Sequence, residues 1–143
     1  MCYFLYISTD CDHDLSTHNN DLIKLEKVVG KDKELPIEIL SHPNIWYVGS
    51  ANGCSCGFRH LMHPDLGFSE PVDWYEENEK DIEATKQLYD ILSKLLRQGQ
   101  MVEVVDKWTH IESKDINTMN VSFSKVKRDE FRLIENYKYI LSN

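Results

Sequence analysis

The chain has 143 residues and a formal net charge of −8, because 24 acidic side chains outweigh 16 lysines and arginines. Proteins that bind nucleic acids or anionic membranes gain affinity through basic side chains, so this balance argues against both kinds of partner. No apolar stretch approaches the ~20 residues that a membrane span needs.

The first seven residues are apolar, but they lack the basic start and the small-residue cleavage site of a signal peptide. We therefore expect a cytoplasmic protein that folds as one domain over residues 1–143. In a reducing compartment its four cysteines are expected to be thiols, metal ligands or buried apolar groups rather than disulfides.

The first half of the chain predicts short strands. Residues 2–8 carry aromatic and β-branched side chains on both faces, which is typical of a central strand covered on both sides. Residues 22–29 alternate loosely and predict a second strand. After a turn signal at residues 30–33, short extended pieces follow at residues 35–40 and 45–48.

One long helix is the best-defined predicted element. Asp73 and Glu76 have the spacing of a capping box, and Gly99 supplies a left-handed stop. Between them, apolar side chains recur at helical spacing, at Ile82, Leu88, Tyr89, Leu92, Leu95 and Leu96. This stripe predicts a helix that packs on a sheet.

Three further extended segments follow this helix. Residues 101–108 are rich in valine, residues 119–123 alternate between apolar and polar, and residues 131–141 are extended with a hairpin turn near Glu135 and Asn136. Strands on both sides of one long helix predict an α+β fold with a mostly antiparallel sheet.

The segment Gly53-Cys54-Ser55-Cys56-Gly57-Phe58-Arg59-His60 concentrates reactive side chains at the end of a predicted strand. Its glycines allow the backbone to turn its N–H groups toward the sulfurs. Those N–H groups and Arg59 would favour thiolate, so Cys54, Cys56 and Arg59 are candidate residues of a thiol-based site. Cys56 is the preferred reactive sulfur, because Gly57 and Arg59 are nearest to it in sequence. His60 or His110 is a candidate base for it.

A metal site is the alternative. Cys54, Cys56, His60 and His63 form a C-x-C-x3-H-x2-H pattern of zinc-preferred ligands. Cys11, at the end of the first strand, would add a third sulfur if it approached the loop. Cys54 and Cys56 could also simply fill space in a tight turn, since cysteine is often buried.

A non-catalytic protein-interaction domain stays open as well, and the acidic surface would suit a basic protein partner. The sequence assigns no reaction and no small-molecule ligand.

The runs Tyr47-Val48-Gly49-Ser50 and 53–59, with Val102-Glu103 and Trp108 after the helix, resemble a small family of uncharacterised bacterial proteins with a G-C-x-C-G-F loop. The resemblance implies a cytosolic α+β domain. It assigns no catalytic residue.

Overall fold

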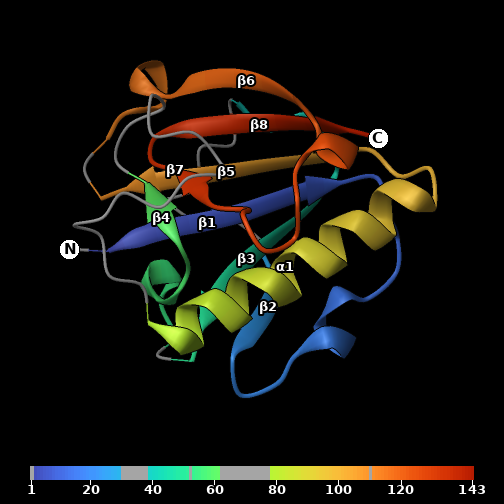
Figure 1. Cartoon of the computed structure of the whole chain (residues 1–143). Helices are drawn as coiled ribbons and strands as arrows, with labels where there is room; N and C mark the ends of the chain where they lie inside the picture. The colour runs from blue at the N-terminus through green and yellow to red at the C-terminus, as the bar shows by residue number, and fades with distance from the viewer. Residues whose placement is uncertain (1, 30–38, 52, 62–77, 110) are drawn as a thin grey trace.

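A computed structural model describes residues 2–29, 39–51, 53–61, 78–109 and 111–143. Six strands form one mixed sheet in the order β2-β3-β1-β5-β8-β6, in which only the β6–β8 pair is parallel. The strands are β2 (Ile23–Lys27), β3 (Asn44–Ser50), β1 (Tyr3–Thr9), β5 (Val102–Trp108), β8 (Tyr137–Ser142) and β6 (Asn117–Ser122). With one helix against it, this sheet confirms the predicted α+β fold (Figure 1).

The helix α1 (Glu79–Arg97) lies across one face of the sheet (Figure 1). It begins behind Asn78, whose side-chain oxygen accepts a hydrogen bond from the N–H of Lys80. The capping box predicted at residues 73 and 76 lies outside the described residues. Gly99 has φ +79°, as the predicted helix stop requires. The predicted stripe enters the core with Leu88, Leu92, Leu95 and Leu96.

The chain turns between β7 (Leu133–Ile134) and β8 at Asn136, which has φ +62°. Asparagine tolerates this left-handed conformation better than most residues. The expected hairpin is nevertheless wrong, because β7 pairs in parallel with β4 (His60–Leu61) in a separate two-stranded sheet. This pairing brings His60 into the core behind β1 and β5.

No helix within the described ranges is long and apolar enough to cross a membrane.

Candidate functional site

The Gly-Cys-Ser-Cys-Gly segment forms a tight turn that closes on Ser50, the last residue of β3. The N–H and the hydroxyl of Ser50 both donate to the carbonyl of Cys54, at 2.7 Å each. Gly53 has φ +84°, which favours glycine. Gly57 is required for a different reason, because a Cβ there would lie 2.4 Å from Ser50 Oγ.

The 3₁₀ turn η3 (Ser55–Gly57) is wedged between β1 and β3. The two strands pair directly from Thr9 opposite Asn44 up to Tyr6 opposite Tyr47. The next pair would join Leu5 to Val48, but the Ser55 hydroxyl takes its place. It accepts from the Leu5 N–H at 3.0 Å and donates to the Val48 carbonyl at 2.6 Å. A side chain thus continues the ladder between two backbones.

The next backbone N–H of β1 on this edge, that of Tyr3, has a sulfur as its hydrogen-bond acceptor. The N–H of Tyr3 donates to Cys56 Sγ at 3.4 Å. Beside it, Cys2 is fixed by Thr109 at the end of β5. The Cys2 N–H donates to Thr109 Oγ1 at 2.9 Å, and the Cys2 carbonyl accepts from the Thr109 N–H and hydroxyl.

These contacts bring Cys2, Cys54 and Cys56 together, with their Sγ atoms all within 4.8 Å of one another. Each of the three is half-buried and free of any disulfide. Cys2 joins the site because β1 and β3 are antiparallel, so that the start of β1 lies beside the end of β3. Cys11, at the opposite end of β1, is instead 2% exposed within the hydrophobic core.

The two cysteines of the turn differ in acidity. Burial by itself would raise the pKa of Cys54, but the N–H of Cys56 and the thiols of Cys56 and Cys2 outweigh burial and lower it. Burial raises the pKa of Cys56 to about 12. The hydrogen bond from the Tyr3 N–H acts against this rise, and the interactions with Cys54 and Cys2 add to it. Of these two thiols, Cys54 is therefore the one that ionises first. The two pKa shifts favour Cys54, whereas the sequence favours Cys56 through its neighbours Gly57 and Arg59.

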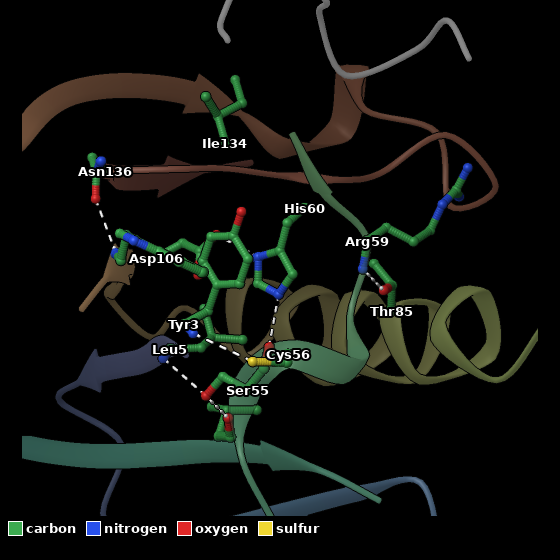
Figure 2. A network of polar contacts seen from close by, with 12 residues as sticks. Tyr3, Leu5, Ser55, Cys56, Arg59, His60, Thr85, Asp106, Ile134 and Asn136 are labelled. Carbon is green, nitrogen blue, oxygen red and sulfur yellow. Dashed lines mark hydrogen bonds and ion pairs between the residues drawn. The ribbon is translucent and has the colours of Figure 1, made fainter. Parts of the chain in front are cut away.

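His60 lies behind the turn, 5% exposed, with both ring nitrogens engaged (Figure 2). Nδ1 lies 2.6 Å from Asp106 Oδ2, and Nε2 lies 2.7 Å from the carbonyl oxygen of Ser55. The ring stacks on Tyr3 at 3.7 Å between centroids, with an interplanar angle of 4°. Burial would lower the pKa of His60, but the charge and hydrogen bond of Asp106 and the Ser55 carbonyl raise it.

Arg59 extends away from the sulfurs (Figure 2). Its backbone N–H donates to Thr85 Oγ1 on α1 at 2.9 Å, and its Nη1 donates to the Asp129 carbonyl at 2.7 Å. This direction gives no support to a role beside Cys54 or Cys56. His63 lies outside the described residues, as does residue 110.

The structure thus brings together two of the predicted zinc ligands, Cys54 and Cys56, and adds Cys2. For His60 to bind a metal at this cluster, its Nε2 or Nδ1 would have to release the Ser55 carbonyl or Asp106. Asp106 and Tyr3 are the other site residues that the sequence analysis did not identify.

Comparison of the chain with protein-family models, curated proteins and solved structures finds no match.

Proposed function

We propose that this protein binds a thiophilic metal ion through Cys2, Cys54 and Cys56, with zinc as the first candidate. The observation that carries the proposal is the convergence of three sulfurs, from two distant segments, within 4.8 Å of one another. Tetrahedral zinc has Zn–S bonds of about 2.3 Å, which places its sulfur ligands about 3.8 Å apart. The cluster needs little rearrangement to reach that spacing.

The surroundings of the cluster support a metal site. Cys56 already accepts a backbone hydrogen bond from Tyr3, and such bonds orient and stabilise ligands. The three side chains are half-buried, so an ion can reach them. Three protein ligands leave one zinc position for water or another donor, as in zinc sites that act on substrates.

The sulfurs are held by the protein's own hydrogen bonds. Cys2 is fixed by Thr109, and the turn is fixed by Ser50 and Ser55. The hydrophobic core contains side chains from the helix and from both faces of β1, and none of the three cysteines belongs to it. We therefore expect chelators to remove the metal while the protein stays folded, unlike peptides whose folding requires zinc.

The test is titration of the reduced, chelator-treated protein with Co²⁺, followed by competition with Zn²⁺. Thiolate ligation gives intense sulfur-to-cobalt absorption in the near ultraviolet, which zinc abolishes when it displaces cobalt. One equivalent should bind, and Cys2→Ser, Cys54→Ser and Cys56→Ser should each weaken binding. Cys11→Ala is the matched control, since it removes a cysteine away from the cluster. The proposal fails if the wild-type chain shows no such absorption, or if the Cys11 variant loses as much.

Thiol chemistry at Cys54 is the second candidate, favoured by the opposite pKa shifts of Cys54 and Cys56. A thiolate that accepts hydrogen bonds from neighbouring thiols is a nucleophile. The neighbouring thiols of Cys56 and Cys2 are close enough to take part in thiol–disulfide exchange with it. Iodoacetamide at neutral pH should label Cys54 before Cys56 in the metal-free protein, as peptide mass spectrometry can show. Labelling of both only after denaturation would eliminate this candidate.

A further inference from the structure

The buried pair of His60 and Asp106 touches a backbone atom of the cysteine turn. That atom is the carbonyl oxygen of Ser55, 2.7 Å from His60 Nε2. The other ring nitrogen is held by Asp106, which is fully buried. In the part of the chain that the structure describes, the second oxygen of Asp106 has no hydrogen-bond partner, so its interaction with His60 dominates the orientation of the pair.

The partners of His60 determine where its protons lie. A carbonyl oxygen only accepts, so Nε2 must carry a proton whenever the contact with Ser55 exists. Nδ1 then either donates a second proton to the Asp106 carboxylate or accepts one from the Asp106 carboxylic acid. The pair is electrically neutral in both cases, which makes its burial tolerable. The Nε2–H bond therefore points at Ser55 in either state.

The Ser55 carbonyl belongs to the peptide unit that joins Ser55 to Cys56 in the turn. The N–H of the same unit belongs to Cys56, and it is the strongest of the groups that lower the pKa of Cys54. Ser55 is held a second time by its hydroxyl, which bridges Leu5 and Val48. His60 holds one end of this peptide unit, and its other end faces a sulfur of the cluster.

We propose that His60, oriented by Asp106, is a positioning residue of the cysteine cluster. It fixes the Ser55–Cys56 peptide unit and with it the directions in which Cys54 and Cys56 present their sulfurs. The inference deepens the proposed metal site and rests on it for its functional meaning. The stacked ring of Tyr3 supports the same arrangement, because Tyr3 contacts His60 with its side chain and Cys56 with its N–H.

Two substitutions of similar size separate positioning from packing. The amide nitrogen of His60→Gln can reach the position of Nε2 and donate to Ser55. The shorter side chain of His60→Asn reaches only the position of Nδ1 and leaves the Ser55 carbonyl without its donor. Both variants remove the imidazole ring and its stacking on Tyr3, so a packing role predicts similar losses in both.

The experiment measures Co²⁺ and Zn²⁺ affinity under conditions in which each variant is fully folded. We expect His60→Gln to stay within about 3-fold of wild type and His60→Asn to bind about 10- to 100-fold more weakly, as for other residues that orient metal ligands. Leu88→Ala, on the buried face of α1, is the control for lost stability alone. Equal affinities in the two His60 variants, or a loss in the Leu88 variant as large as in His60→Asn, would overturn the proposal.

The rate of Cys54 alkylation in metal-free protein is a second measure of positioning by His60, and it does not depend on whether the protein binds a metal. We expect His60→Asn to change the rate by about 5-fold, the effect of one hydrogen bond, and His60→Gln to leave it near that of wild type. Absence of metal binding in the wild type together with this rate difference would refute the metal proposal alone. Identical rates in wild type and both variants would refute positioning by His60.

Discussion

Replacement of Ser55 by alanine should destabilise this protein far more than loss of one hydroxyl usually does. Ser55 is fully buried, and its Oγ is inserted between two strands at the centre of the sheet. It accepts from the Leu5 N–H at 3.0 Å and donates to the Val48 carbonyl at 2.6 Å. Alanine removes the oxygen without allowing β1 and β3 to close, because the turn backbone still lies between them.

The cost follows from the two groups left behind. Leu5 and Val48 are both fully buried, so their unpaired N–H and carbonyl are shielded from water. A buried polar group without a partner costs about 1–3 kcal/mol, and two such groups give an expected loss of about 2–4 kcal/mol. The total stability of a small domain is only about 5–15 kcal/mol, so this is a large fraction of it.

Urea denaturation followed by circular dichroism measures this loss. With a slope of about 2 kcal/mol per M, the midpoint of Ser55→Ala should fall by about 1–2 M. Ser124→Ala, at an exposed serine, should change the free energy of unfolding by less than about 0.5 kcal/mol. A loss of under about 1 kcal/mol in Ser55→Ala would refute the claim that the hydroxyl replaces a rung of the ladder.

Three further predictions concern the network around the turn. The pKa of His60 is raised in the folded state, so its stabilisation is complete below its ordinary value of 6.5 and is lost as pH rises through the folded pKa. Urea midpoints measured from pH 6 to 9 should therefore decline in the wild type, and this decline should be smaller in His60→Gln. Gly57→Ala places a Cβ 2.4 Å from Ser50 Oγ and should cost about 1–3 kcal/mol by overpacking. An added Cβ at Gly53 would meet open space, but the residue has φ +84°. Gly53→Ala should therefore lower the free energy of unfolding by about 1–2 kcal/mol through backbone strain alone, as thermal unfolding can measure. An unchanged free energy of unfolding would contradict strain as the cause.

The elements of the fold could be predicted because their signals are local. Apolar side chains four residues apart, such as Leu88 and Leu92, define the buried face of α1, and Gly99 marks its end. The pairing of the strands has no such local signal. Residues 133–134 read as one arm of a hairpin, yet they pair with residues 60–61 across the domain. Tertiary packing decides that choice.

The candidate site was predictable only where its residues are close in sequence. Cys54 and Cys56 stand out beside their glycines, but Cys2 lies 52 residues from Cys54, and Asp106 lies 46 residues from His60. For Cys2 a usable signal exists. In an antiparallel pair the start of one strand lies beside the end of the other, so a loop after β3 approaches Cys2 and not Cys11. For Asp106 the sequence carries no comparable signal, because an acidic residue in a strand is usually on its exposed face.

The sulfur of Cys56 accepts a hydrogen bond from the Tyr3 N–H of β1, so metal binding at Cys56 should change the hydrogen exchange of that amide. Metal ligation requires the Cys56 thiolate, and a charged acceptor strengthens the hydrogen bond from the Tyr3 N–H. The gain of about 1 kcal/mol should slow amide hydrogen exchange at Tyr3 about 5-fold when zinc is added. The Leu5 amide, two residues along the same strand, donates to the Ser55 hydroxyl and is the internal control. Slowing confined to Tyr3 would place the ion on Cys56, whereas equal slowing at Tyr3 and Leu5 would contradict this local effect and indicate a general gain in stability.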